Sequence, residues 1–387
     1  MLLGRFYDAL EVSRQDKIIV ARFLKPHLVV STCRAAGGMR RGLECIYNHQ
    51  SCEPTGHQSG LPASAHQDPE EYRRLVCRRY GLAPESCATL GTAANMNNAA
   101  IARESFRRQQ VVAVCTGGVE TNAGRVGDPA LLYEEDGRYY KVSEPAPPPA
   151  GTINTMLFIN RELTPGALVR SLVTATEAKT AVLQELAVNS RYSPELATGT
   201  GTDQIAAACL LDTGKPLTGA GKHAKLGELI GRAVHRAIKQ TLATQNELTP
   251  AGQCSVRVHL ERFGADRERF RREVTRHLTP EQARLFEDNY DCINRDPMTV
   301  AAVAALVHLR DKLAWGVLPA TCRPEVLASY AAQVAAAASG RYERLPEYRQ
   351  ALALTCDQDG DQEVLALACR ALALGFSQKW EPWPEDG

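Results

Sequence analysis

Short apolar segments bordered by runs of glycine, threonine and asparagine recur through the first two thirds of the chain. The apolar segments cover residues 111–114, 156–159 and 205–211, and the polar runs beside them cover residues 115–124, 151–155 and 197–203. Short β-branched apolar runs are typical of strands. Glycine lets the backbone approach a ligand closely, and functional groups tend to lie on loops held by a rigid scaffold. We therefore predict that the three polar runs converge on one site.

Two stretches carry the apolar period of a helix. The first covers residues 164–189, with Thr164 as N-cap and Pro165 as first helical residue, and the second covers residues 223–242. The apolar rows are Leu168, Leu172, Thr176, Leu183 and Leu186 in the first, and Leu226, Leu229, Ile230, Ala233, Val234, Ala237 and Ile238 in the second. Spacings of three and four residues predict a buried helix face. The whole pattern predicts an α+β fold in which a mixed sheet is covered by these long helices.

A lysine interrupts the apolar row of the first helix. Lys179 stands between Leu172 and Leu183 at the spacing of that row. Either its stem follows the edge of the row and the ammonium reaches water, or the ammonium is partly buried and directed at the site. Glu177 lies beside the row and does not face Lys179, because residues two apart on a helix point in different directions.

The composition changes near Gln245. Beyond it the chain is rich in Ala, Arg, Glu and Leu, and proline is expected in the first turn of several helices. These prolines are Pro280, Pro297, Pro324 and Pro346. The predicted organisation is a domain over residues 1–245, with loops over residues 51–70 and 144–150, a linker over residues 246–254, and an all-helical extension over residues 255–387.

The overall composition and charge bear on which partners and which cell compartment are expected. The chain has 387 residues, 44% of them hydrophobic, and a formal net charge of +1, which favours neither nucleic acid nor an anionic membrane as a partner. The N-terminus lacks the apolar core of a signal peptide, and no apolar stretch is long enough to span a bilayer. We therefore expect a cytoplasmic protein whose 12 cysteines are reduced. Cys45, His49, Cys52 and His57 match no standard zinc spacing, so no metal site is expected.

Several motifs in a fixed order carry a family resemblance. They cover residues 31–38, 92–95, 116–123, 151–154, 176–180, 197–203 and 221–227. Together they resemble the adenosylcobinamide amidohydrolases of corrinoid salvage, over about residues 15–245. The resemblance implies a hydrolase that cleaves the amide joining aminopropanol to a propionate of the corrin ring, which gives adenosylcobyric acid. It implies a small corrinoid substrate that carries its own cobalt, no further cofactor, and it leaves a homo-oligomer open.

A second resemblance bears on mechanism. Gly151 and Thr152, followed by an apolar strand and a helix, resemble the nucleophile region of ornithine acetyltransferases and related amidases. In those proteins a Thr or Ser at such a strand start is the nucleophile and is freed by self-cleavage, and residues 116–124 resemble their oxyanion-hole segment. This resemblance favours their sheet-and-helix sandwich over a Rossmann-like doubly wound sheet, for which a dinucleotide fingerprint is also missing. Cleavage before Thr152 is left as an open expectation.

Amide hydrolysis requires a nucleophile, a proton shuttle and donors for the developing oxyanion. Thr152 is the first candidate nucleophile because it stands at a glycine-preceded strand start. Asn154, Thr155 and Cys115 are alternatives, and so is an activated water. Cys115 follows an apolar strand, which favours a buried thiol over a reactive one.

Further residues complete the expected site. Asp203 or Glu177 is the expected general base, His223 a proton shuttle near pH 7, and Lys179 a partly buried cation. The structural alternatives are an N-cap or turn for Asp203, a helix start for His223 and the edge of the apolar row for Lys179. The expected substrate-binding residues are Thr116, Gly117, Gly118, Asn122, Asn154, Thr198, Thr200 and Thr202. Among them, Thr116, Gly117 and Asn122 are the candidate oxyanion donors.

Two other functions compete with hydrolysis. A nucleotide-phosphate site would need a P-loop, but Pro216 stands where its first glycine belongs and His223 replaces its Ser or Thr. A non-catalytic corrinoid carrier could use the same hydroxyl-rich loops, and Lys179, Asp203 and His223 would then lack an evident purpose.

Overall fold

The computed structural model describes residues 1–52, 68–142, 151–354 and 361–380. The chain forms two compact units, Met1–Leu248 and Thr249–Gly387, here called the first and second unit. The predicted loops over residues 51–70 and 144–150 lie mostly or wholly outside the described residues.

The first unit is built on two main sheets. The five-stranded sheet has the order β1 (Leu2–Phe6), β2 (Leu10–Gln15), β3 (Ile18–Phe23), β6 (Cys45–Gln50) and β7 (Cys87–Thr92). The six-stranded sheet has the order β5 (Gly38–Arg40), β4 (His27–Ser31), β15 (Gln204–Leu210), β13 (Ile153–Ile159), β9 (Gln109–Gly117) and β8 (Ala100–Phe106). Both are mixed, because β6 is parallel to β7 and β13 is parallel to β15 while their other pairs are antiparallel. Short ladders join β10 (Ala123–Gly124) to β14 (Gly199–Thr200) and β11 (Leu132–Glu135) to β12 (Arg138–Lys141).

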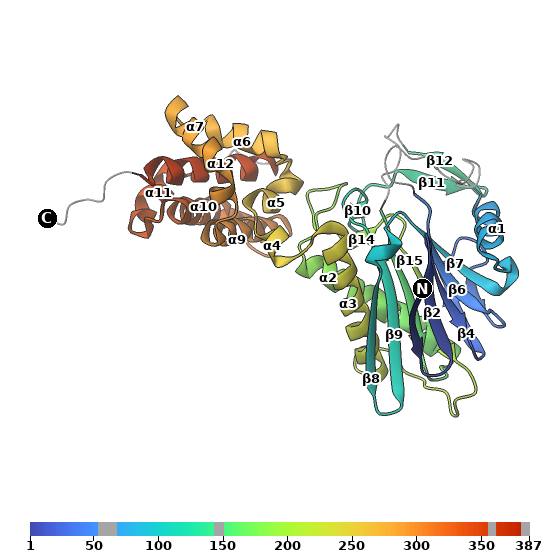
Figure 1. Ribbon diagram of the computed structural model, residues 1–387. Coiled ribbons are helices and arrows are strands. Elements are labelled where there is room, and N and C mark those ends of the chain that lie inside the picture. Colours follow the sequence, from blue (N-terminus) through green and yellow to red (C-terminus); the bar gives the residue numbers. More distant parts are fainter. Residues whose placement is uncertain (53–67, 143–150, 355–360, 381–387) are drawn as a thin grey trace. The chain divides into compact units, whose positions relative to one another are not determined.

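The two main sheets pack face to face, with helices on the outer side of each (Figure 1). Alternation along β13 shows why: Met156 and Phe158 enter the core between the sheets, and Leu157 and Ile159 enter the core under the helices. Helices α2 (Pro165–Glu185) and α3 (Lys225–Asn246) cover the six-stranded sheet, and α1 (Pro69–Tyr80) covers the other.

This arrangement confirms the predicted α+β class and corrects its details. A single mixed sheet was expected, but a second main sheet packs against the face of the six-stranded sheet that α2 and α3 do not cover, and antiparallel pairs in the six-stranded sheet exclude the doubly wound alternative. Thr164 caps α2 as predicted, but the helix ends at Glu185, and Ala187 beyond it has a positive φ of 47°. Helix α3 begins at Lys225 and leaves His223 outside it. Thr176 is exposed, because the buried face of α2 runs through Ala175 and Ala178 instead.

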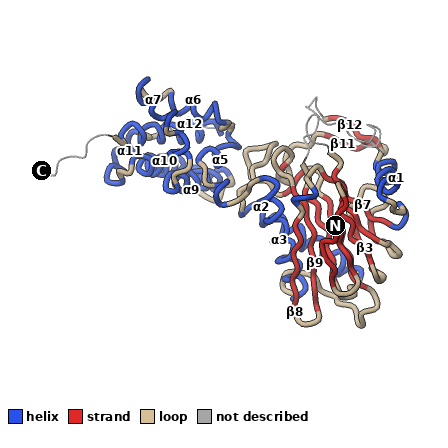
Figure 2. The backbone as a smooth tube through the Cα atoms, viewed as in Figure 1, coloured by secondary structure: helices blue, strands red, loops and turns tan. Residues whose placement is uncertain are grey.

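The described part of the second unit is helical (Figure 2). Its helices are α4 (Pro250–Gln253), α5 (Val256–Leu260), α6 (Arg267–Thr275), α7 (Pro280–Asp288), α8 (Tyr290–Asn294), α9 (Pro297–Ala314), α10 (Arg323–Ser339), α11 (Leu345–Ala351) and α12 (Asp361–Gln378). Its short 3-10 turns are η4 (Glu261–Phe263), η5 (Ala320–Cys322) and η6 (Tyr342–Arg344), whereas η2 (Pro84–Ser86) and η3 (Met96–Asn98) belong to the first unit. All four prolines of the sequence pattern lie in the first turn of a helix, as predicted. Close packing of α12 on α10 needs Gly375, because a Cβ there would lie 2.3 Å from the Ala335 carbonyl oxygen.

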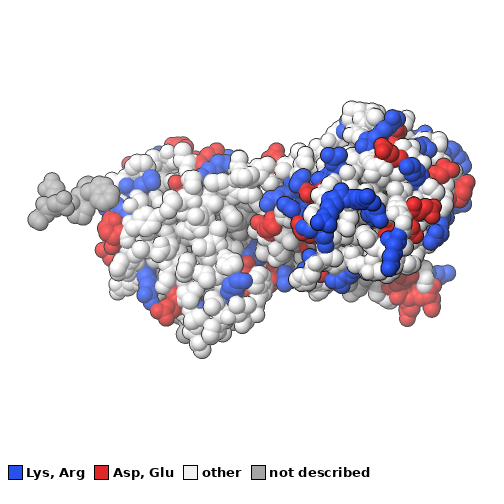
Figure 3. All heavy atoms as spheres, turned by 90° about the horizontal axis from the view of Figure 1, so that it is seen from below, with Lys and Arg blue, Asp and Glu red and all other residues white. Residues whose placement is uncertain are grey.

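Helix hydropathy and the charges on one face of the molecule are the features relevant to membrane and polyanion partners. None of the helices among the described residues combines the length and apolar character needed to cross a bilayer. Figure 3 shows Lys and Arg interspersed with Asp and Glu on the face that it displays. This mixture agrees with the net charge of +1.

Candidate active site

The topology of the six-stranded sheet brings the three polar runs together. β13 runs antiparallel to β9, so Ile153 at its start pairs with Gly117 at the end of β9. β13 runs parallel to β15, so Asn154 pairs with Gln204 at the start of β15. The end of β9 and the starts of β13 and β15 therefore share one edge of the sheet. The predicted convergence of the three runs is confirmed.

Two threonine hydroxyls meet at this edge. Thr152 Oγ1 lies 2.5 Å from Thr202 Oγ1, which also donates to the Gly151 carbonyl oxygen at 2.9 Å. Because the hydrogen of Thr202 is used in that bond, its lone pairs are left to accept from Thr152. Asn122 Nδ2 donates to the same Gly151 oxygen at 2.8 Å and to Thr202 Oγ1 at 3.4 Å. Thr152 is buried, and Thr202 is exposed.

An ion pair flanks the hydroxyl pair. Lys179 Nζ contacts Asp203 Oδ2, and both side chains keep 16% of their surface exposed. Asp203 Oδ1 also accepts from the Ile153 N–H at 2.9 Å and from the Thr200 hydroxyl at 2.6 Å. The geometric prediction for Lys179 is thus confirmed: its ammonium is largely buried against a carboxylate rather than extended into water. We call Asn122, Thr152, Lys179, Thr202 and Asp203 the Thr152 cluster.

Glycines make room for this cluster. A Cβ on Gly199 would lie 2.5 Å from Asp203 Oδ2 and 2.8 Å from Lys179 Nζ. A Cβ on Gly151 would lie 2.9 Å from Asn122 Cβ. Contacts under 3.0 Å need a shift of the neighbouring groups, so a side chain at either position would displace members of the cluster.

A second polar network lies beneath the cluster, between the two sheets. Asn154 is fully buried, and its Nδ2 donates to Asn48 Oδ1 and to the Gly91 carbonyl oxygen, both at 2.9 Å. Asn48 Nδ2 in turn donates to Thr116 Oγ1 at 2.9 Å. Asn154 and Thr116 therefore join the sheets rather than offer free groups at the edge. Sequence reasoning missed Asn48, which follows the apolar residues at the start of β6 and precedes His49 and Gln50.

The expected backbone donors are already used within the chain. The Gly117 N–H donates to Thr241 Oγ1 at 3.2 Å, and the Gly118 N–H donates to the Thr152 carbonyl oxygen at 3.1 Å. Gly117 is needed for packing, since a Cβ there would lie 2.8 Å from Leu242 Cδ2. Of the candidate oxyanion donors, the Asn122 amide is the one that the structure brings to the hydroxyl pair.

Other expected residues lie outside the cluster. Glu177 is exposed and lies 3.4 Å from Lys222, and His223 is exposed. Within the described part of the chain, no hydrogen bond or ion pair links either residue to Thr152, Thr202 or Asp203. Glu177 points away because Lys179 occupies the inward direction of that turn of α2.

Two of the alternative nucleophiles, Cys115 and Thr155, lie buried side by side, and Cys115 belongs to the core under the helices. Cys115 is fully buried and its Sγ lies 3.6 Å from Thr155 Oγ1. Burial raises the pKa of the Cys115 thiol to about 12, so at neutral pH it carries its proton and is a poor nucleophile. Of the loop hydroxyls, Thr198 Oγ1 accepts from the Val126 N–H at 2.8 Å, and Thr200 is held by Asp203.

Four Cys and His residues lie close together in the sequence, namely Cys45, His49, Cys52 and His57. Cys45 and His49 lie buried on β6, with His49 Nδ1 2.6 Å from the Tyr72 hydroxyl, and His57 lies outside the described residues. Among the residues that the structure describes, no group of three or more His, Cys, Asp or Glu side chains is arranged to hold a metal ion.

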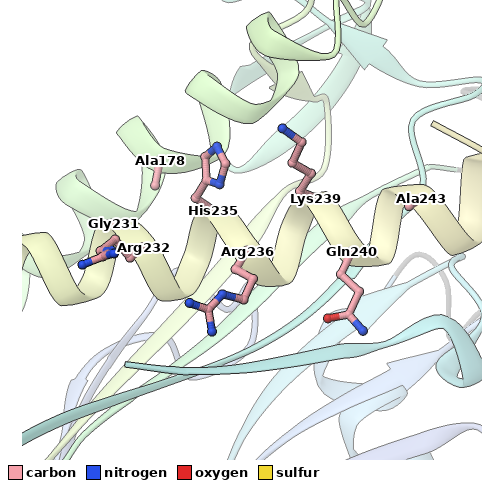
Figure 4. A pocket seen from close by; sticks show the side chains of 8 residues that line it. All are labelled: Ala178, Gly231, Arg232, His235, Arg236, Lys239, Gln240 and Ala243. Carbon is pink, nitrogen blue, oxygen red and sulfur yellow. The ribbon is translucent and has the colours of Figure 1, made fainter. Parts of the chain in front are cut away.

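An open groove of about 710 Å³ crosses the outer face of α3 (Figure 4). Its lining residues are Ala178, Gly231, Arg232, His235, Arg236, Lys239, Gln240 and Ala243. Its basic side chains already have carboxylate partners: Glu228 for Arg232, Glu104 for Arg236, and Glu185 for His235 and Lys239. None of the lining residues belongs to the Thr152 cluster, so the groove adds no chemistry to the site.

Comparison with known proteins agrees with the motif pattern. A family model described as adenosylcobinamide amidohydrolase matches residues 4–250, which span the whole Thr152 cluster and end just inside the second unit. An uncharacterized protein of Methanocaldococcus jannaschii is 41% identical over 184 residues, which cover 46% of this chain and 71% of that protein. Since the family model covers more than half of the chain, the chain belongs to the adenosylcobinamide amidohydrolase family.

Proposed function

We propose that this protein hydrolyses the amide between aminopropanol and the corrin ring of adenosylcobinamide, giving adenosylcobyric acid and aminopropanol in corrinoid salvage. Membership of the family supports the substrate class. The observation that carries the proposal is the buried Thr152 hydroxyl, paired with Thr202 and flanked by the Lys179–Asp203 ion pair at one sheet edge. Amide hydrolysis needs a nucleophile beside groups that manage charge and protons, and this edge supplies both.

In the proposed reaction, Thr152 Oγ adds to the amide carbonyl carbon and the carbon–nitrogen bond breaks. Aminopropanol leaves with the proton taken from the hydroxyl, and one water then hydrolyses the ester to the carboxylate. Asp203 is the proposed base, and it is oriented by Lys179 and by the hydrogen bonds from Ile153 and Thr200. A water activated by Asp203 is the alternative nucleophile, and the Thr152 variants described below separate the two.

Mass spectrometry of adenosylcobinamide after incubation with the full chain tests the proposal. Hydrolysis replaces the aminopropanol amide by a carboxylate, so the corrinoid loses the mass of aminopropanol and gains that of water. A gain of a phosphoryl group, with ATP present, would support the phosphate-transfer function instead. An unchanged corrinoid that co-elutes with the protein would overturn hydrolysis and support a carrier. The Asp203→Asn protein is the matched control for contaminating activity.

Self-cleavage before Thr152 is a separate proposal. The Gly151 carbonyl oxygen accepts from both Asn122 and Thr202, and two converging donors are what a developing oxyanion requires. If Thr152 Oγ attacks this carbonyl, denaturing electrophoresis shows two fragments, residues 1–151 and 152–387. A single intact band in an active preparation shows that hydrolysis does not depend on cleavage.

A further inference from the structure

Tyr192 reaches the Thr152 cluster although no motif in the sequence pointed to it. It lies in the loop between α2 and β14, and its hydroxyl donates to Asn122 Oδ1 at 2.6 Å. Asn122 is the residue whose amide nitrogen holds both Gly151 and Thr202. A single hydroxyl is therefore one hydrogen bond away from the group that orients the hydroxyl pair.

The bond from Tyr192 decides which way the Asn122 amide points. A primary amide presents an acceptor oxygen on one side and a donor nitrogen on the other. With Oδ1 held by Tyr192, Nδ2 faces the Gly151 carbonyl oxygen at 2.8 Å. The flipped amide would set its own oxygen against that carbonyl oxygen, and two acceptors at this distance repel. The tyrosine bond and the Gly151 bond therefore favour the same orientation.

Tyr192 is itself firmly placed. Its backbone N–H donates to Ser190 Oγ at 3.1 Å, and that hydroxyl donates to Asp128 Oδ2 at 2.6 Å. Its ring lies against Gly124, where a Cβ would come within 3.1 Å of Tyr192 Cδ2. Burial, and then the charge of Asp128, raise the pKa of Tyr192, so its hydroxyl keeps its proton at neutral pH and remains a donor.

We propose that Tyr192 is a positioning residue of the active site, whose hydroxyl holds the Asn122 amide in the orientation that supports the Thr152–Thr202 pair. The inference rests on the proposed function for its kinetic consequence. Its structural content, the orientation of one amide, can be measured without any substrate.

The kinetic test compares Tyr192→Phe with Tyr80→Phe. Tyr80 is a matched control because its hydroxyl donates to Asp16 at 3.4 Å, outside the Thr152 cluster. Loss of one hydrogen bond that positions a reacting group lowers kcat about tenfold, with KM within about twofold. Tyr80→Phe leaves both constants unchanged. A Tyr192→Phe protein with wild-type kcat overturns the proposal.

Asn122→Ala decides whether Tyr192 acts through Asn122. In that background Tyr192→Phe has no further effect on kcat, because the amide that it orients is gone. Losses that multiply in the double variant would show that Tyr192 acts by another route, and would overturn the proposal.

The closing experiment needs no turnover. In protein labelled with 15N at asparagine, the Asn122 side-chain amide signal is identified by its absence from Asn122→Ala. Tyr192→Phe shifts this signal and speeds its hydrogen exchange, and Tyr80→Phe does neither. An Asn122 signal unmoved by Tyr192→Phe overturns the inference even if the enzyme is active. A shifted signal in a protein that does not cleave adenosylcobinamide supports the inference and rejects the proposed function.

Discussion

Among the described residues, an ion pair in each unit is largely shielded from solvent, and the two pairs differ in what surrounds them. In the first unit Lys179 meets Asp203, and both side chains keep 16% of their surface exposed. In the second unit Arg262 meets Asp311 at 2.5 Å, and the side chains keep only 2% and 4%. Burial alone would make the second pair the more unusual one. Its neighbours show that it is structural.

The pair in the second unit is closed. Arg310 also bonds Asp311, with Nη1 3.2 Å from Oδ1, so one carboxylate serves two guanidinium groups. Both guanidinium groups lie over the ring of Phe263, at 4.9 Å and 5.1 Å from its centroid. The two guanidinium charges and the carboxylate charge are therefore stabilised within the protein, by cation–π contacts and by two charge-assisted hydrogen bonds. Such a cluster holds helices together and offers nothing to a ligand.

The pair in the first unit is open. Asp203 bonds backbone and hydroxyl groups of its own loop, and its chain neighbour Thr202 is exposed. A hydroxyl pair lies beside it, which the second unit's cluster lacks among its described contacts. Under the proposed function, residual solvent access and adjacent hydroxyls are what distinguish a reactive charge pair from a structural one.

Replacing the candidate nucleophile has the largest expected effect. Thr152→Ala lowers kcat by roughly 10³-fold or more, because no other group at this edge forms the ester. Thr152→Ser keeps the hydroxyl and retains activity. Circular dichroism melts of both variants stay close to wild type, since the fold depends on the strand backbone. Unchanged turnover in Thr152→Ala would eliminate Thr152 as nucleophile and favour a water activated by Asp203.

Neutralising the open pair comes next. Asp203→Asn keeps the size of the side chain but removes the negative charge and one acceptor, so kcat falls about 10²–10³-fold. All three tryptophans follow Leu248 in the sequence, and Trp315 and Trp380 lie in the described part of the second unit, so tryptophan fluorescence during urea unfolding does not report the first unit. The folding control for Asp203→Asn is therefore a circular dichroism melt, which stays close to that of the wild type. A variant that keeps wild-type kcat would place Asp203 in the scaffold.

The corresponding Asp→Asn substitution in the closed pair is expected to lower stability and to leave kcat unchanged. Asp311→Asn leaves the buried guanidinium groups of Arg262 and Arg310 without their carboxylate, and breaking a buried pair costs about 3–5 kcal/mol. Tryptophan fluorescence during urea unfolding measures this loss in the second unit. The kcat of Asp311→Asn, measured at urea concentrations below its unfolding transition, stays at the wild-type value. A loss of kcat without a loss of stability would contradict the division of roles between the two pairs.

The sequence predicted those parts of the site that depend on local pattern. The N-cap at Thr164, the inward position of Lys179 and the meeting of three strand-end loops all follow from residue spacing. Asn48 and Tyr192 were missed because their roles come from partners 68 and 70 residues away along the chain, which no local period reveals. The five-stranded sheet was missed for the same reason, since its strands are short and are stabilised by pairing with one another.

Removing the second unit has the smallest expected effect on catalysis. The cut belongs after Leu248 rather than after Gln245, the boundary that composition suggested. Asn246 Oδ1 accepts from the Val119 N–H at 3.2 Å, in the loop that follows β9, and Leu248 packs against the core under the helices.

A protein of residues 1–248 therefore keeps every member of the Thr152 cluster and the contacts that fix its loops. We expect its kcat/KM on adenosylcobinamide to lie within about twofold of the full chain, because no step of the proposed reaction uses the second unit. A protein of residues 1–245 is the matched comparison. It lacks the Asn246 bond and the Leu248 contact, so it melts at a lower temperature by circular dichroism. If the protein of residues 1–248 folds fully and yet fails to hydrolyse the substrate, the second unit contributes to catalysis. The closed Arg262–Asp311 pair would then stabilise a unit that catalysis needs.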